Sequence, residues 1–142
     1  MIEIPIQIVK LENDNFHILI GGSFHDGTSA NWIIDTGASK TVLDLNLTEF
    51  YEILESDPEE DYQSAGINQG MLYTTVGVIS KMKLGDLEIF NQKVALIDLN
   101  HVNEIYEKYT SCKIAGLLGG DILMKYQCVI DYEMKIIRFH NI

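Results

Sequence analysis

The chain has 142 residues, of which 46% are hydrophobic, and its 21 acidic and 10 basic residues leave a net charge of -11 at pH 7. This length predicts a single domain, spanning residues 1–142, with a sizeable core. The composition excludes a disordered chain, and the negative charge repels phosphate backbones and anionic lipids, so neither nucleic acid nor a membrane is an expected partner.

The cysteines and the N-terminus indicate a compartment. Cys112 and Cys128 are too few for a disulfide framework and lie in no metal-ligand spacing, so we expect two free thiols. The first residues lack the basic and apolar regions of a leader, and no apolar run approaches the ~20 residues that span a bilayer. These features predict a cytoplasmic protein, although a chain already trimmed of a signal peptide would look the same.

The first third of the chain has the pattern of β-strands. Isoleucines alternate with polar residues from residue 2 to residue 8, and Pro5 places that strand at a sheet edge. A turn cluster at residues 12–15 separates it from a second strand, and two glycine-bearing turns, Gly21-Gly22 and Asp26-Gly27, precede a third. The strands expected here cover residues 2–8, 16–20 and 29–34.

The remaining two thirds alternate strands with short helices. Asp44 is positioned to cap a helix in which Leu47, Phe50, Tyr51 and Leu54 fall at helical spacing, and an acidic loop follows it. Further helices are expected at residues 103–109 and 121–126. Further strands are expected at residues 41–43, 76–84, 87–97, 114–118, 127–131 and 136–139.

Asp35 is the candidate catalytic residue. It follows the buried strand end Trp32-Ile33-Ile34 and precedes Thr36 and Gly37, so one carboxylate stands where a core strand breaks into a tight turn. The tripeptide Asp-Thr-Gly alone is more often a simple strand-ending turn. The wider pattern, with Ala38-Ser39 and then Thr41-Val42-Leu43, resembles the active-site loop of aspartic proteases, and the alanine resembles the retroviral, or retropepsin-like, branch.

Two later stretches extend this resemblance. Residues 114–123, with Leu117-Leu118-Gly119 leading into a helix, are similar to the second signature of the family, and Val129 to Tyr132 resembles a strand ending of its bacterial members. The resemblance implies a mainly β fold, a closed antiparallel barrel-like lobe with two or three short helices. It also implies a flap hairpin over the substrate, for which the residues with the matching glycines are Gly66, Ile67, Asn68, Gln69 and Gly70; an ordinary β-turn is the alternative reading there.

Hydrolysis by carboxylates needs two of them close together and sharing one proton, with no metal or other cofactor. One chain supplies only Asp35, because the second glycine turn has Gly119 where an acid would fall. We therefore expect a homodimer that cleaves polypeptides, with Asp35 of each subunit forming the pair. The resemblance assigns supporting roles in the active-site loop to Thr36, Gly37, Ala38 and Ser39. The termini, residues 2–8 and 136–139, have edge-strand character that could add to the dimer contact.

The sequence departs from the retroviral pattern at Ser39 and Gly120. The retroviral enzymes usually carry an ion pair at the positions of Ser39 and Gly120, and both partners are absent here. Residues 37–41 lack the glycine spacing of a phosphate loop, and the four histidines have no ligand spacing. A catalytically silent domain that binds peptides or mediates dimerisation is the alternative function, although the intact Asp35-Thr36-Gly37 favours an enzyme.

Overall fold

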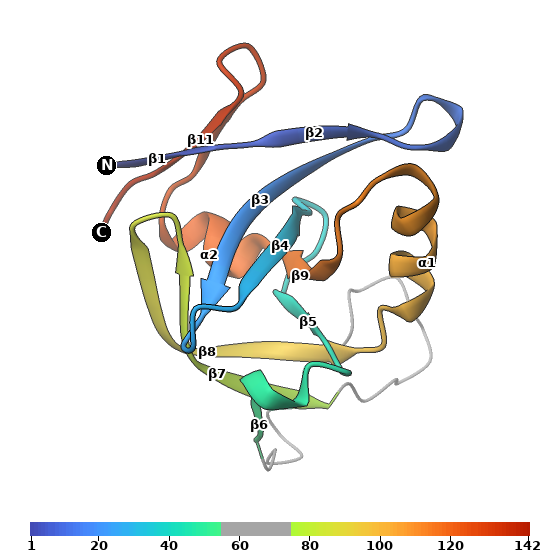
Figure 1. Ribbon diagram of the computed structural model, residues 1–142. Coiled ribbons are helices and arrows are strands. Elements are labelled where there is room, and N and C mark those ends of the chain that lie inside the picture. The colour runs from blue at the N-terminus through green and yellow to red at the C-terminus, as the bar shows by residue number, and fades with distance from the viewer. Residues whose placement is uncertain (55–74) are drawn as a thin grey trace.

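A computed structural model of the chain describes residues 1–54 and 75–142. It is mainly β, as expected, with two α-helices and two short 3-10 helices in these ranges (Figure 1). The strands are β1 Ile2–Pro5, β2 Gln7–Lys10, β3 Phe16–Phe24, β4 Ser29–Ile34, β5 Val42–Asp44, β6 Glu52–Ile53, β7 Val76–Leu84, β8 Leu87–Ile97, β9 Ile114–Leu118, β10 Val129–Asp131 and β11 Ile136–Phe139. The helices are α1 Asn100–Tyr109, α2 Gly120–Lys125 and the 3-10 turns Glu12–Asp14 and Thr48–Phe50.

Six of these strands close into a barrel, which confirms the expected fold class. The ring runs β3-β4-β9-β5-β8-β7, and β7 pairs back onto β3. Two of the pairings, β4 with β9 and β5 with β8, are parallel, and the others are antiparallel. The barrel closes where Gly22 lies opposite Leu84, and a Cβ on Gly22 would come within 2.3 Å of the Lys83 carbonyl oxygen. A side chain at residue 22 would therefore obstruct closure.

Two apolar clusters hold the barrel. The first contains fully buried side chains from five or more strands, among them Trp32, Leu43, Met82 and Leu118. The second contains Leu19, Ile33 and Ile114, and it includes Tyr106 of α1, which is 1% exposed and hydrogen-bonded to His17. Alternation along β4 explains this division, because successive residues of a strand point to opposite faces.

The termini form a second sheet with the order β1-β11-β10, and they lie side by side (Figure 1). The expected strand 2–8 is divided at Ile6, because β1 pairs with β11 while β2 pairs with β3. The expectation that residues 136–139 are an open edge is wrong. β11 has β1 on one side and β10 on the other, so both of its edges are already hydrogen-bonded within the chain.

The helix expected after Asp44 is also wrong. Only the short 3-10 turn forms there, and Asp44 is 2% exposed instead of capping a helix. Its carboxylate accepts hydrogen bonds from the backbone N–H of Asn46 and of Leu99, at 3.2 and 3.1 Å. A buried carboxylate is stable only when donors surround it, and here they link β5 to the start of α1.

Smaller differences concern the bounds of the predicted strands and helices. Gly21 and Gly22 lie inside β3 and do not end it, and α1 begins three residues before the expected start at Asn103. The strands 29–34, 76–84, 87–97, 114–118 and 136–139 have the expected bounds. Both cysteines are free. No helix within residues 1–54 and 75–142 is long and apolar enough to cross a membrane.

The burial of Tyr106 predicts a loss of stability at alkaline pH. Desolvation raises the pKa of its phenol to about 12, and Cys112 adds to the rise. The unfolded chain releases this proton near pH 10 while the folded chain keeps it, so the free energy of unfolding falls as pH rises through this range. Urea unfolding should show a loss of about 1 kcal/mol between about pH 9 and 11 in the wild type, and a smaller loss in Tyr106→Phe. Equal losses in both proteins would contradict this assignment.

Candidate active site

The parallel pairing of β4 with β9 brings the two glycine turns of the sequence together. Ile34 lies opposite Leu118, and the backbone N–H of Asp35 donates to the Leu118 carbonyl oxygen at 2.9 Å. Asp35 therefore leaves the barrel beside Gly119, although 84 residues separate the two positions in the sequence. The two halves that looked similar in the sequence thus meet at one end of the barrel.

The five residues expected in the active-site loop lie in one turn. Asp35 is half-buried, Thr36, Gly37 and Ser39 are exposed, and Ala38 is half-buried. The backbone N–H of Gly37 donates to Asp35 Oδ1 at 3.0 Å, and the N–H of Ala38 donates to the Asp35 carbonyl oxygen at 3.2 Å. The turn therefore holds the carboxylate at the surface, within reach of water and of another molecule.

A second set of contacts connects the loop to the start of α2. Thr41, which is fully buried, donates to Asp121 through its hydroxyl at 2.7 Å and through its backbone N–H at 3.1 Å. The same hydroxyl accepts the N–H of Gly119 at 3.1 Å. Sequence reasoning missed this pair, because Thr41 read as the start of a strand and Asp121 as the start of a helix. An aspartate directly after two glycines at a helix start is the one local signal, and it does not identify Thr41 as the partner.

Next to Ser39, a backbone hydrogen bond joins the Asp35 loop to Gly120. The N–H of Gly120 donates to the Ala38 carbonyl oxygen at 2.7 Å. Gly119 lies closer still, since a Cβ there would be 2.6 Å from the Lys40 carbonyl atoms and 2.9 Å from the Ala38 oxygen. The loop and the second glycine turn therefore touch through their backbones, and Gly119 leaves room for this approach.

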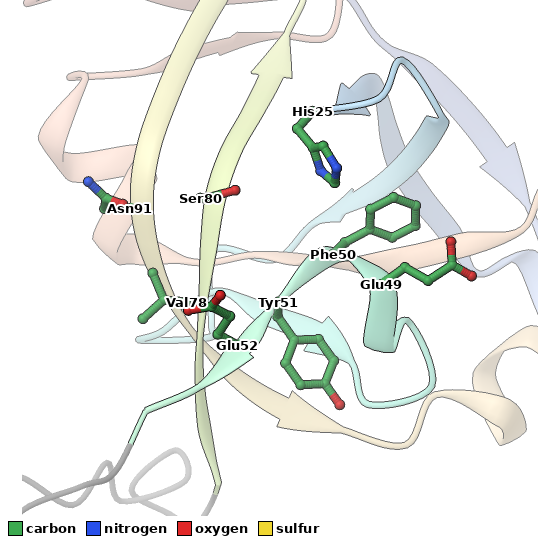
Figure 2. Close-up of a pocket in the computed structure, with 8 residues that line it drawn as sticks. All are labelled: His25, Glu49, Phe50, Tyr51, Glu52, Val78, Ser80 and Asn91. Carbon is green, nitrogen blue, oxygen red and sulfur yellow. The ribbon is translucent and has the colours of Figure 1, made fainter.

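One pocket is lined by residues outside the Asp35 loop. It has a volume of about 260 Å³ and lies between the β3–β4 turn, residues 49–52 and strands β7 and β8 (Figure 2). The rings of His25 and Phe50 meet edge to face there with centroids 5.9 Å apart, and Ser80 and Asn91 lie on the opposite side. None of residues 35–39 lines this pocket. The pocket is therefore not part of the loop that carries the candidate catalytic residue.

The sequence also predicted a flap over the site and no metal. The flap residues Gly66, Ile67, Asn68, Gln69 and Gly70 lie outside the described residues. In the part of the chain that is described, no group of three or more His, Cys, Asp or Glu side chains is placed to hold a metal ion. The polar groups of the Asp35 loop itself include the Asp35 carboxylate, the hydroxyls of Thr36 and Ser39 and the backbone N–H groups.

Comparisons with known proteins point to one family. Residues 18–122 match the model of a family described as aspartyl protease. The fold is similar to a retropepsin-like aspartic protease from Rickettsia conorii, with a TM-score of 0.50 and 17% identity over 94% of this chain and 89% of the other. It is also similar to the retroviral protease-like domain of Ddi1 from Leishmania major, with a TM-score of 0.53 and 14% identity over 96% and 92% of the two chains. A comparison with curated proteins gave no match.

The two adjacent glycines allow a matched test of the backbone contact. Gly119→Ala places a Cβ 2.6 Å from backbone atoms of Lys40, so it should lower the free energy of unfolding by about 1–3 kcal/mol. Gly120→Ala adds a Cβ whose nearest neighbour is 3.5 Å away, at the first residue of α2, and should change it by less than about 0.5 kcal/mol. Urea unfolding of both variants measures the difference, and equal effects would contradict the close approach.

Proposed function

The chain belongs to the aspartyl protease family, and we propose that it is an aspartic endopeptidase whose catalytic pair consists of Asp35 from each of two copies. The observation that carries the proposal is the position of Asp35. Its carboxylate is half-buried at the end of a core strand, in an exposed Gly-bearing turn that is hydrogen-bonded to the second glycine turn. A carboxylate held in this way is oriented by the fold and still reaches a substrate.

The proposed reaction uses the two carboxylates in different protonation states. The ionised one accepts a proton from a bridging water while the water oxygen bonds to the peptide carbonyl carbon, and the protonated one donates to the carbonyl oxygen. When the resulting gem-diol collapses, the carboxyl group that took the water proton donates it to the departing amine nitrogen and the C–N bond breaks. One hydroxyl of the gem-diol gives its proton to the other carboxylate as the C=O bond forms, which restores the starting protonation of the pair. Two negative charges on adjacent carboxylates repel each other, so the pair is not fully ionised and shares one proton.

A second copy is the proposed source of the second acid. The residues that meet Asp35 within the chain are Leu118, at the end of β9, and Gly119, and neither carries a group that can transfer a proton. A two-fold symmetric contact through residues 35–37 would place Asp35 next to its own copy. β11 is not available for this contact by strand addition, because both of its edges are occupied. The outer edges of β1, β2 and β10 are the remaining terminal candidates.

The proposed substrate is a polypeptide in an extended conformation, bound by backbone hydrogen bonds near the Asp35 loop. Residues 66–70 are the proposed flap above it, and residues 36–39 are proposed to support the catalytic carboxylate and to contact the substrate backbone. The alternative is a silent domain that binds peptides or mediates dimerisation. The intact carboxylate and its orienting Gly37 N–H favour the enzyme.

Substitution of the catalytic acid tests the activity. Asp35→Asn removes proton transfer while keeping the size of the side chain, so peptide cleavage between about pH 4 and 7 should fall at least about 100-fold. Asp86→Asn, at an exposed turn between β7 and β8, is the matched control and should cleave like the wild type. Unchanged cleavage by Asp35→Asn would refute the catalytic role, and no cleavage by the wild type would favour the silent domain.

Dilution tests the shared site. If each active site needs two chains, the activity per chain should fall on dilution below the dimer dissociation constant, by mass action. Sedimentation at the same concentrations provides the fraction of dimer. Full activity in a sample shown to be monomeric would refute the shared pair while leaving the role of Asp35 open to the substitution test.

A further inference from the structure

The loop that carries Asp35 is tied to β9 and α2 at three points. At its start the N–H of Asp35 donates to the Leu118 carbonyl oxygen, and in its middle the Ala38 carbonyl oxygen accepts the N–H of Gly120. At its end Thr41 is hydrogen-bonded to Asp121. The first two ties join backbone atoms, whereas the third needs the Asp121 carboxylate for both of its hydrogen bonds and the Thr41 hydroxyl for one of them.

Asp121 is surrounded by donors from three segments. Its Oδ1 accepts the Thr41 hydroxyl at 2.7 Å and the N–H of Ile122 at 2.9 Å. Its Oδ2 accepts the Thr41 N–H at 3.1 Å and Gln92 Nε2, on β8, at 3.5 Å. Hydrogen bonds to an ionised acceptor are stronger than neutral ones, and several together fix the position of a carboxylate. Asp121 therefore holds the end of the loop against both the helix and the barrel.

The Thr41 hydroxyl is used in both directions. It donates to Asp121 and accepts the N–H of Gly119, and the side chain is fully buried. A valine has the same shape but neither hydrogen-bonding capacity, and it would leave the Gly119 N–H without its partner. A serine keeps the hydroxyl. The contact thus requires the chemistry of a hydroxyl in addition to the volume of the side chain.

From these contacts we infer that Thr41 and Asp121 are positioning residues, which hold the Asp35 loop at the spacing that the catalytic pair needs. The inference rests on the proposed function. A displacement of about 1 Å at a reacting group is enough to slow catalysis about 100-fold, and shared protonation weakens as two carboxylates separate. Thr41 and Asp121 also connect the two turns at the end of the loop, close to the positions where the ion pair of the retroviral enzymes is missing in this chain.

The test compares Thr41→Val and Thr41→Ser with Thr110→Val. Thr110 is the control, because its hydroxyl likewise donates one hydrogen bond and accepts one: it donates to the Tyr106 carbonyl oxygen and accepts the N–H of Cys112, at the end of α1. Thr41→Val should lower kcat at least about tenfold with KM changed less than about threefold, and it should narrow the pH range of activity. Thr41→Ser should restore both, and Thr110→Val should alter neither at equal fractions of folded dimer. Wild-type kcat and pH range in Thr41→Val would overturn the inference.

Two additions keep failure of this inference separate from failure of the proposed function. If Thr41→Val does not fold, Asp121→Asn replaces it, because an amide keeps one acceptor oxygen and should shift kcat and the pH range in the same direction. If the wild type cleaves no peptide, the proposed function fails, and amide hydrogen exchange then tests the positioning alone. The Asp35 and Ala38 amides should exchange at least about tenfold faster in Thr41→Val than in Thr110→Val. Equal exchange in the two variants would overturn the inference.

Discussion

The parallel pairing of β4 with β9 is the contact on which the rest of the molecule depends. It aligns Ile34 with Leu118, so the two places where the chain leaves the barrel through a glycine turn lie side by side. The backbones of these turns then approach closely enough for a hydrogen bond between Gly120 and Ala38, which Gly119 permits because it has no side chain. Barrel closure through β3 and β7 and the packing of Trp32 inside support that pairing from within.

This arrangement accounts for the chemistry proposed at the site. The Asp35 loop presents one carboxylate per chain, and the second glycine turn has Leu118 and Gly119 where an internal second acid would be needed. The loop is held by hydrogen bonds between Thr41 and Asp121 as well as by backbone contacts. Such contacts would support the proposed pairing of this loop with an identical loop across a symmetry axis.

Local patterns predicted much of the fold, since alternation of apolar and polar residues identified most strands and the Asp35 motif identified the candidate loop. The errors concern residues whose roles depend on distant partners. Gly22 was predicted to lie in a turn, but it permits β3 to pair with β7. Asp44 was predicted to cap a helix, but its carboxylate accepts the N–H of Leu99. The strand 136–139 read as an edge because its neighbour β1 begins 134 residues earlier in the chain. Nothing local to Thr41 or Asp121 shows that they meet, because the two are 80 positions apart in the sequence.

We propose that each active site contains Asp35 from two chains, and this can be measured by mixing wild-type chains with Asp35→Asn chains at concentrations where both are dimeric. Random pairing in an equal mixture leaves half of the wild-type chains with a wild-type partner, so activity per wild-type chain should fall to about one half, and to about one tenth in a ninefold excess of the variant. Activity per wild-type chain that stays constant at every ratio would contradict the claim.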